Sequence, residues 1–258
     1  MDRLQHLVDD FIANGNSPRI CVDSNIGGGK STFLAKLKQS GIKGVELLFE
    51  PVSDWQNIIS KETGDSYNIL DEFYQDQEKN GYMFQTMTFI TRMETHLKAD
   101  SKSLVVGERS WFTDRHVFVE QMYRNKVLTD FQLACYDRWF HFWTQERLAG
   151  QINLDGIFFI DTPAKVCFMR KDQLRKRKEE SSIPLSYLES LEERHHEWLL
   201  SNSLNGLESD KKYYVSKNNI PVYRVDGDID FEHNEDDWNK IVGAFTDFLM
   251  SIKKLKEN

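Results

Sequence analysis

A glycine-rich segment near the start of the chain has the residue types and spacing of a phosphate-binding loop. It fits the Walker A pattern at every defining position except the first, where serine replaces glycine. Its residues are Ser24, Asn25, Ile26, Gly27, Gly28, Gly29, Lys30, Ser31 and Thr32. The glycines let backbone N–H groups face a phosphate, and a helix beginning near Lys30 would add its positive dipole end. We expect Lys30 to contact β- and γ-phosphates and the Ser31 hydroxyl to bind Mg²⁺.

Two further groups of charged residues follow predicted strands and have the chemistry to act on an acceptor. Glu50 ends the run 45–49 and could accept the proton of an attacking hydroxyl. Glu108 and Arg109 end the run 104–107, where a carboxylate could hold magnesium and a guanidinium could neutralise phosphoryl charge. Alone, Glu50-Pro51 is an ordinary strand exit and Glu108-Arg109 an ordinary surface salt bridge. Carboxyl ends of parallel strands, however, are where open α/β sheets place their sites.

The elements that must position these residues alternate short apolar runs with long helical patterns. This alternation is typical of a parallel sheet covered by helices, so we predict an α/β P-loop kinase fold with five parallel strands. The predicted strands are 19–23, 45–49, 104–107, 156–160 and 221–225. The predicted helices are 30–39, 81–98, 130–149, 163–175, 184–199 and 235–254, and the polar segment 204–219 is expected to be a loop with a short helix.

Length and composition limit the class of protein. A chain of 258 residues with 40% hydrophobic and 29% charged residues predicts one globular domain, residues 1–258. The net charge of −8 disfavours an extended nucleic-acid surface. No apolar run reaches bilayer length, and no secretion signal is recognised at the start. Three cysteines, Cys21, Cys135 and Cys167, are not closely spaced, which favours a reducing cytoplasm over a disulfide scaffold.

Several motifs occur together in these strand-exit positions. They are the Walker A segment, Glu50-Pro51-Val52, Phe84-Gln85-Thr86, Glu108-Arg109-Ser110 and a late basic cluster over residues 170–178. In this combination the sequence resembles the deoxynucleoside kinase family, and within it the deoxycytidine and deoxyguanosine kinases most. The resemblance runs from about Arg19 to Phe231. It implies ATP-dependent, magnesium-assisted phosphorylation of the 5′-hydroxyl of a deoxyribonucleoside.

The resemblance also implies roles for individual residues. Glu50 would be the general base, with Arg109 beside it at the reacting oxygen. Gln85 would bond the edge of the base, because an amide offers both a donor and an acceptor. The remaining contacts to the nucleoside, by packing on the base or by holding the sugar 3′-hydroxyl, would come from Trp55, Tyr74, Phe84, Phe118 and Glu180.

The basic cluster would form a short arginine-rich lid, about residues 170–183, over the ATP phosphates. Arg175 and Arg177 are the expected phosphate ligands, since forked guanidiniums suit phosphate. Arg170 is one residue further from Arg175 than the family pattern, so it is not assigned to the nucleotide. Asp230 and Phe231 resemble the segment that borders adenine.

Arg92 and Asp114 bear on the choice of base. Arg92 follows Gln85 by about two helical turns, so both side chains can face one pocket. In the resembling family an Arg–Asp pair goes with cytosine or purine substrates, and it would occupy the space that a thymine methyl needs. A solvent-facing salt bridge is the alternative. Thr88 matches neither specificity pattern, so cytosine and purine stay open.

Two other functions fit parts of the pattern. A thymidylate-kinase-like nucleoside monophosphate kinase shares the loop, lid and sheet but needs a second cationic pocket. A non-catalytic nucleotide-binding protein would not need Glu50.

The stretches 81–98 and 130–149 are rich in aromatic residues around much of their circumference. This pattern predicts either a homodimer through a pair of helices or ordinary core helices.

Overall fold

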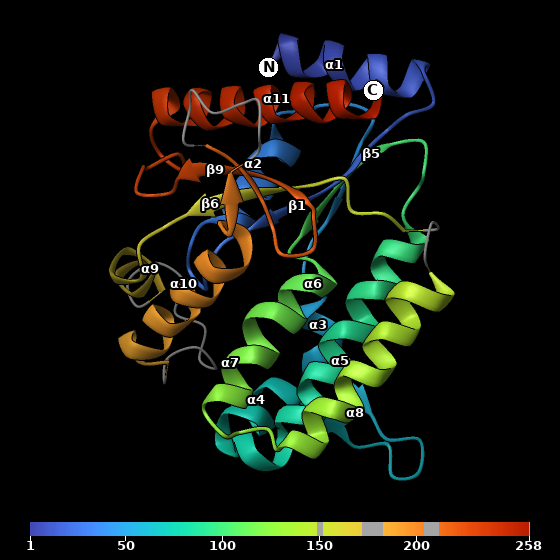
Figure 1. The fold of residues 1–258 in the computed structure, drawn as a ribbon, viewed down its shortest axis with the longest axis vertical. Coiled ribbons are helices and arrows are strands. Elements are labelled where there is room, and N and C mark those ends of the chain that lie inside the picture. The colour runs from blue at the N-terminus through green and yellow to red at the C-terminus, as the bar shows by residue number, and fades with distance from the viewer. Residues whose placement is uncertain (149–151, 172–182, 204–211, 258) are drawn as a thin grey trace.

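The computed structural model describes residues 1–148, 152–171, 183–203 and 212–257, and within them a central sheet lies between layers of helices (Figure 1). Five strands of this sheet are parallel, as predicted. In spatial order they are β2 (Val45–Leu48), β5 (Leu104–Glu108), β1 (Arg19–Asp23), β6 (Gly156–Asp161) and β9 (Pro221–Asp226). These runs are apolar because both sheet faces are covered.

Two short antiparallel strands extend the sheet beyond β9. They are β8 (Tyr213–Val215) and β7 (Asn202–Ser203). The prediction of a loop with a short helix over 204–219 is therefore wrong at Tyr213–Val215, and residues 204–211 lie outside the described part. The sequence Tyr213-Tyr214-Val215 is rich in strand-forming residues, but its polar surroundings obscured that signal.

Three helices cover one face of the sheet. They are α1 (Asp2–Ala13), α2 (Lys30–Gln39) and α11 (Glu235–Glu257). Aromatic rings fill this layer: Phe33 of α2 lies 5.6 Å from Phe158 of β6 and 5.4 Å from Phe245 of α11, measured between centroids. Helices α1 and α11 lie side by side at the outside (Figure 1). The analysis of the sequence did not identify α1.

The opposite face carries α10 (Leu185–Leu199) and a π-helical turn, η1 (Asp114–Val119), which pack together over β6 and β9. Helix α9 (Ala164–Arg170) precedes α10, with residues 172–182 between them outside the described part. The predicted helix 163–175 is thus confirmed as far as Arg170, and its remainder falls largely among those residues.

A helical half of the molecule extends below the sheet in Figure 1. Its elements are α3 (Val52–Gln56), α4 (Ile69–Gln75), α5 (Gln77–Lys98), α6 (Trp111–Thr113), α7 (Glu120–Arg124), α8 (Asp130–His141), the π-helical turn η2 (Phe142–Arg147) and a hairpin of β3 (Ile58–Ile59) with β4 (Ser66–Tyr67). The predicted helix 130–149 therefore changes to π geometry at Phe142. Asp76 separates α4 from α5 by accepting a bond from the Lys79 N–H at 3.0 Å.

The strand register brings together, at the carboxyl ends of the strands, the segments predicted to carry the chemistry. Val22 of β1 lies opposite Glu108, and Leu48 of β2 lies opposite Gly107. The residues that follow these strands, including Glu50 and Arg109, therefore emerge beside the glycine-rich loop. Among the described residues, no helix has both the length and the apolar composition that a membrane crossing requires.

Candidate active site

The glycine-rich loop joins β1 to α2 and needs glycine at two of its positions. Gly27 and Gly29 have φ values of 76° and 102°, which side chains rarely tolerate. A Cβ on Gly27 would lie 2.6 Å from the Cys167 carbonyl oxygen, and one on Gly29 would lie 2.7 Å from the Phe231 ring. Helix α2 begins at Lys30, so its free N–H groups and dipole face the loop. The loop therefore has the backbone geometry that a phosphate cradle requires, and its binding of phosphate stays a prediction.

Lys30 and Ser31 lie where the motif predicts them. The Lys30 ammonium is buried and donates to the carbonyls of Ser24 at 3.2 Å and Asn25 at 2.8 Å. Burial, together with the charge of Arg109, lowers the pKa of Lys30 to about 8. The Ser31 hydroxyl donates to Glu108 Oε1 at 2.5 Å. Serine and carboxylate oxygens therefore meet at the head of α2, and these are the hard ligands that Mg²⁺ prefers.

The serine at the first loop position is accommodated by the glycine at the fifth. Ser24 is fully buried, and its hydroxyl has no hydrogen-bond partner among the described residues. A Cβ on Gly28 would lie only 1.8 Å from that hydroxyl oxygen. Thr162 fixes the same glycine from another side by donating to its carbonyl at 2.9 Å. The departure from the Walker A pattern is therefore compensated within the loop.

The other loop residues differ in what they contact. Asn25 donates its amide to the Leu188 carbonyl of α10 at 2.8 Å, so its side chain anchors the loop to the protein. Ile26 lines one cavity, whereas Gly27 and Thr32 line a second. Adjacent residues of one loop thus belong to two neighbouring cavities.

The second cavity lies beside the phosphate cradle and measures about 990 Å³. The segment after β9 forms one wall, with Asp230 and Phe231 among its residues. Phe231 is buried against Gly29, while the Asp230 carboxylate is exposed and pairs with His233 at 3.0 Å. The structure therefore places Asp230 and Phe231, the residues predicted to border adenine, in the wall of the cavity beside the loop, together with Arg170.

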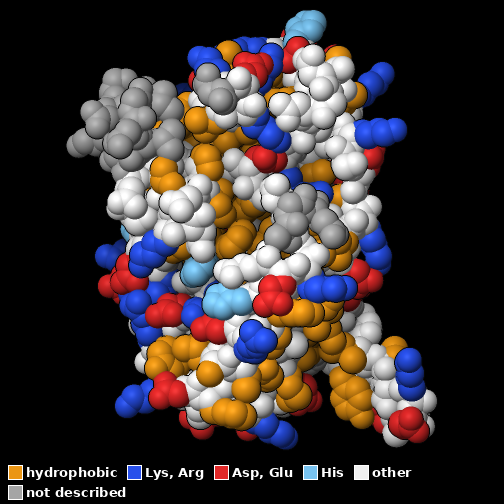
Figure 2. Space-filling model, turned by 45° about the vertical axis from the view of Figure 1, so that its right-hand side comes forward, with side chains coloured by type: hydrophobic (Ala, Val, Ile, Leu, Met, Phe, Trp, Pro, Cys, Tyr) orange, Lys and Arg blue, Asp and Glu red, His pale blue; other side chains and the backbone are white. Residues whose placement is uncertain are grey.

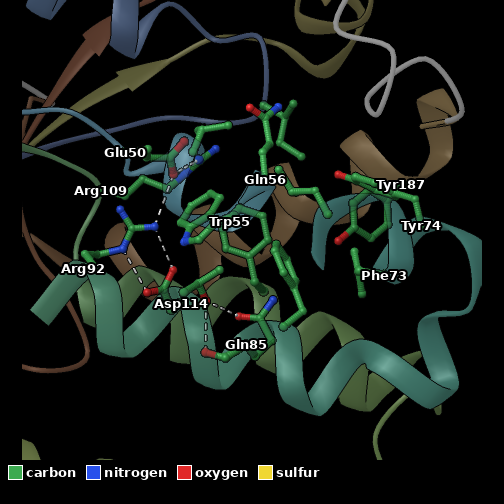
Figure 3. Close-up of a pocket in the computed structure, with 16 residues that line it drawn as sticks. Glu50, Trp55, Gln56, Phe73, Tyr74, Gln85, Arg92, Arg109, Asp114 and Tyr187 are labelled. Atoms are coloured by element: carbon green, nitrogen blue, oxygen red, sulfur yellow. Dashed lines mark hydrogen bonds and ion pairs between the residues drawn. The ribbon is translucent and has the colours of Figure 1, made fainter. Parts of the chain in front are cut away.

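The first cavity measures about 730 Å³ and lies between the loop and the helical half (Figure 3). Polar and charged groups line one end, and aromatic rings line the other. Its residues are Ile26, Glu50, Val52, Trp55, Gln56, Leu70, Phe73, Tyr74, Phe84, Gln85, Thr88, Arg92, Arg109, Asp114, Phe118 and Tyr187. All the described residues predicted to contact a nucleoside lie in this wall.

Glu50 stands between two guanidinium groups at the polar end. Its Oε1 accepts from Arg109 Nη1 at 2.5 Å and from Arg92 Nη2 at 3.2 Å. Burial alone would raise the pKa of Glu50, but the charges of Arg109 and Arg92 outweigh burial and hold it well below its usual range. Glu50 is therefore ionised at neutral pH. Arg109 has a φ of 62° and lies over the Phe118 ring at 4.9 Å.

Arg92 and Asp114 form a buried ion pair, which removes the solvent-facing alternative. Arg92 Nε donates to Asp114 Oδ2 at 2.9 Å and Nη2 to Oδ1 at 3.2 Å, a forked contact, and only 4% and 3% of the two side chains is exposed. Arg92 Nη1 also donates to the Glu108 carbonyl at 2.7 Å. One guanidinium thereby connects Asp114, Glu50 and the end of β5.

The far end of the cavity is aromatic around one amide. Gln85 is buried, and the Thr88 hydroxyl, one turn later in α5, lies 3.0 Å from the backbone carbonyl oxygen of Gln85 and 3.4 Å from its side-chain oxygen. Its amide nitrogen meets the weak acceptor Met122 Sδ at 3.4 Å, so a better acceptor could replace that contact. Trp55 is fixed by an indole bond to Thr91 at 2.9 Å. Phe84 stacks on Phe73 with centroids 4.6 Å apart.

A family model described as deoxynucleoside kinase matches residues 20–250. The chain belongs to the deoxynucleoside kinase family. Deoxyguanosine kinase, mitochondrial, from Xenopus laevis is 32% identical over 88% of this chain and 89% of its own length. Deoxycytidine kinase from Homo sapiens is 29% identical over 91% of this chain and 92% of its own. Thymidine kinase 2, mitochondrial, from Homo sapiens is 34% identical over 72% of this chain and 65% of its own.

This deoxynucleoside kinase is accordingly a phosphotransferase, and enzymes of the family use ATP as the phosphate donor, generally with a divalent metal. The residues predicted as lid and sugar ligands, Arg175, Arg177 and Glu180, lie outside the described residues of the kinase. Of the predicted lid 170–183, the structure describes only Arg170, Lys171 and Ile183.

The structure adds cavity residues of the deoxynucleoside kinase that the sequence analysis missed. Tyr187 projects beside Tyr74, with both hydroxyls turned toward the cavity (Figure 3), and burial raises its pKa to about 12. It lies in the first turn of α10, three residues after Pro184, so its place beside the predicted lid was the available signal. Val52, Leu70 and Phe73 carried no signal beyond apolar character. The π-helical turn η1 directs both Asp114 and Phe118 into the wall.

A third cluster in the kinase contains possible metal ligands. Asp161, Glu192 and His196 offer oxygen and nitrogen atoms within 4.8 Å of one another. Both Asp161 oxygens are already bonded, one to His196 at 2.8 Å and one to Arg224 at 2.6 Å. The arrangement is satisfied internally as an ion-pair cluster.

Proposed function

We propose that the protein transfers the γ-phosphoryl group of ATP to the 5′-hydroxyl of a deoxyribonucleoside, with the nucleoside in the first cavity and ATP in the second. The observation that carries this assignment is the position of the loop. Ile26 lines the first cavity and Gly27 the second, so an acceptor and a phosphate chain would meet where Glu50, Arg109 and Lys30 gather.

In this proposal Glu50 is the general base. Its carboxylate would accept the 5′-hydroxyl proton as that oxygen bonds to the γ-phosphorus and the bond to the β-phosphate oxygen breaks, releasing ADP. Because Glu50 is held ionised, it is ready to accept a proton but is a weak base, which suits a loose transition state with late proton transfer. Arg109 and Lys30 would stabilise the charge on the transferred group.

The Ser31 hydroxyl and the Glu108 carboxylate would hold Mg²⁺, directly or through water. Their 2.5 Å contact supports this assignment, since it places a hydroxyl oxygen and a carboxylate oxygen side by side. When bound, the ion supplies positive charge to the β- and γ-phosphates. Asn25 through Thr32 would supply the cradle, Arg175 and Arg177 the lid over the phosphates, and Asp230 with Phe231 the border of the adenine.

We propose deoxycytidine or a purine deoxynucleoside as the acceptor in preference to thymidine. Sequence similarity does not decide the choice of base, because relatives named for deoxyguanosine, deoxycytidine and thymidine all match. The buried Arg92–Asp114 pair supports the proposal, since it presents fixed charged groups near Gln85 where a thymine methyl would need apolar space. Trp55, Phe84 and Phe118 would pack the base, and Tyr74 with Glu180 would hold the 3′-hydroxyl.

A monophosphate acceptor fits the cavity less well. Its two described cations, Arg92 and Arg109, are both bonded to carboxylates. A phosphorylated acceptor would bring negative charge beside Glu50 and Asp114 without an uncommitted cation to receive it. A non-catalytic nucleotide-binding protein is inconsistent with the enzyme family.

The test is a substrate panel with purified protein, measuring ADP release with Mg²⁺, ATP and each deoxynucleoside or its monophosphate. We expect turnover with deoxycytidine or a purine deoxynucleoside, and little with thymidine or monophosphates. Glu50→Gln serves as the control that turnover comes from this site. A preference for thymidine would refute the proposed specificity, and a preference for monophosphates would refute the assignment of the acceptor.

A homodimer through α5 and α8 is proposed from exposed apolar side chains. Met83, Ile90 and Leu97 recur every seventh residue along α5 and are about half exposed, and Phe131 of α8 is 77% exposed. Figure 2, which brings the right-hand side of Figure 1 forward, shows hydrophobic side chains gathered on the lower half of the molecule. Sedimentation analysis of wild type and Ile90→Glu tests this, with a dimer expected only for wild type.

Two further assignments stay proposals. A single domain over residues 1–258 is supported by the continuity of the sheet from β2 to β7 and by the packing of α1 on α11. A cytoplasmic location is supported by Cys21, Cys135 and Cys167, which are all unpaired thiols.

A further inference from the structure

Arg170, the last residue of α9, lies in the wall of the second cavity, but its guanidinium is bonded to protein. Its Nη1 donates to the Gly227 carbonyl at 2.9 Å and its Nη2 to the Ile229 carbonyl at 3.0 Å. The planar fork of a guanidinium suits such a pair of acceptors, because it fixes both their spacing and their direction. Arg170 therefore fixes the backbone that follows β9 through two hydrogen bonds.

This segment, residues 227–232, makes several other contacts that fix its position. The Gly227 N–H donates to the Asp161 carbonyl at 2.9 Å, and the Asp228 N–H to Asp226 Oδ1 at 2.9 Å. Lys36, on the helix that follows the phosphate loop, donates to the Glu232 carbonyl at 3.1 Å. A Cβ on Gly227 would lie 1.9 Å from the Thr162 hydroxyl, so the backbone also packs tightly there. Arg170 supplies the bonds on the α9 side of this frame.

The same segment forms the cavity wall that we assign to the nucleotide base. Ile229, Asp230, Phe231 and Glu232 all line it, and Phe231 packs against Gly29 of the phosphate loop. A wall segment selects a base by the fixed positions of the groups that it turns toward the cavity, backbone N–H and C=O groups among them. Its selectivity therefore depends on whatever keeps that backbone still.

We propose that Arg170 is a positioning residue for the phosphate donor: by clamping the Gly227 and Ile229 carbonyls it fixes the wall that reads the donor base. This inference rests on the proposed placement of ATP in the second cavity. An arginine near a nucleotide can act in two ways, as a phosphate ligand or as a residue that positions the wall around the base. A phosphate ligand stabilises the triphosphate chain whatever base is attached, whereas a clamp on the wall affects the base and not the chain.

The experiment measures dissociation constants of ATP, GTP, CTP, UTP and inorganic tripolyphosphate, all with Mg²⁺, for wild type, Arg170→Lys and Arg170→Gln. Two charge-assisted bonds are at stake, so we expect ATP to bind about tenfold more weakly to both variants. Tripolyphosphate should bind within about twofold of wild type, and the wild-type ranking of the four nucleotides should flatten. Arg170→Lys should weaken ATP binding nearly as much as Arg170→Gln, because lysine keeps the positive charge but lacks the two-pronged guanidinium.

Two control variants separate the possible failures. Lys165→Gln removes an exposed cation from the same helix and should leave all five constants unchanged. Lys30→Ala should weaken ATP and tripolyphosphate together; if it weakens neither, the assignment of ATP to this cavity fails. If Lys30→Ala behaves as expected but Arg170→Gln weakens tripolyphosphate as much as ATP, with Arg170→Lys largely restoring both, Arg170 is a phosphate ligand and the clamp is refuted. Unchanged nucleotide binding and ranking in Arg170→Lys would also refute it.

Discussion

The loop that we propose as the phosphate cradle and the first cavity, which we propose as the acceptor cavity, adjoin each other but are built in different ways. The cradle is one run of consecutive residues, shaped by backbone with positive φ at Gly27 and Gly29 and by the start of α2. The acceptor cavity collects side chains from loops, α3, α4, α5, η1 and α10, and its polar end is a network of buried charges. A backbone-built site is sensitive to added atoms, and a side-chain-built site is sensitive to removed partners.

The largest effect should come from removing one member of the buried charge network. Asp114→Ala leaves Arg92 without its forked partner, and breaking a buried pair costs about 3–5 kcal/mol of unfolding free energy. Adding Arg92→Met should recover part of that loss, because the buried guanidinium that has lost its forked partner is then removed. Urea unfolding measures both.

Glu94→Ala provides the matched control, since it breaks the exposed Glu94–Lys98 pair on the same α5 helix and should cost no more than about 0.5 kcal/mol. If Asp114→Ala is as mild as this control, the acceptor cavity does not depend on buried pairing in the way described.

Glu50→Gln should separate the two sites in function. Turnover should fall roughly a hundredfold or more, because the amide cannot accept the proton, while the dissociation constant of ATP changes little. The pKa of Glu50 is depressed, so in wild type its basic form is lost only as pH falls through that low value. The acidic decline of kcat should then lie below about pH 4.3, the usual glutamate value. A decline centred near pH 6 would assign the base to another group.

Gly28→Ala tests whether the cradle is limited by space. The added methyl would meet the Ser24 hydroxyl, so we expect a loss of about 1–3 kcal/mol in unfolding free energy and weaker ATP binding. Ser24→Gly should be mild alone, and the double variant Ser24→Gly/Gly28→Ala should recover most of the loss. Calorimetric titration with ATP measures the coupling, and strictly additive effects would contradict the described compensation between the two positions.

The smallest expected effect is the difference in stability between two substitutions of Arg109, a residue where the two modes of construction coincide. Arg109 contributes a side chain to the acceptor cavity but has the φ of 62° that favours glycine. Arg109→Gly and Arg109→Ala should both lose turnover. The unfolding free energy of the glycine variant should nevertheless be about 1 kcal/mol higher than that of the alanine variant, because alanine keeps the backbone strain. Equal urea midpoints and slopes for the two variants would indicate that the backbone relaxes freely.

The same contrast explains what the sequence could reveal. All five parallel strands were predicted to within about one residue, because buried strands are short apolar runs, and the cradle was identified from consecutive residues. The acceptor cavity was identified through family motifs, and the residues those motifs did not carry were missed. Tyr187 and Phe73 reach the cavity only through the packing of α10 and α4, and π geometry at Asp114 has no recognised sequence signal.

Helix α1 and the strands β7 and β8 were missed for different reasons. Leu4, Val8 and Phe11 have the spacing of a buried helical face, but this segment was considered only as a possible secretion signal. The two strands are short and pair at the sheet edge, so tertiary pairing rather than local pattern defines them.

The adjacency of Ile26 and Gly27 has a consequence for inhibitor chemistry. Neighbouring residues of one loop line the two cavities, and consecutive Cα atoms are only about 3.8 Å apart. Under the proposed assignment of the two cavities, a bisubstrate compound with a nucleoside joined to an adenosine through a phosphate chain would span both sites by a short path. Its affinity would gain from the high effective concentration of the second half once the first has bound.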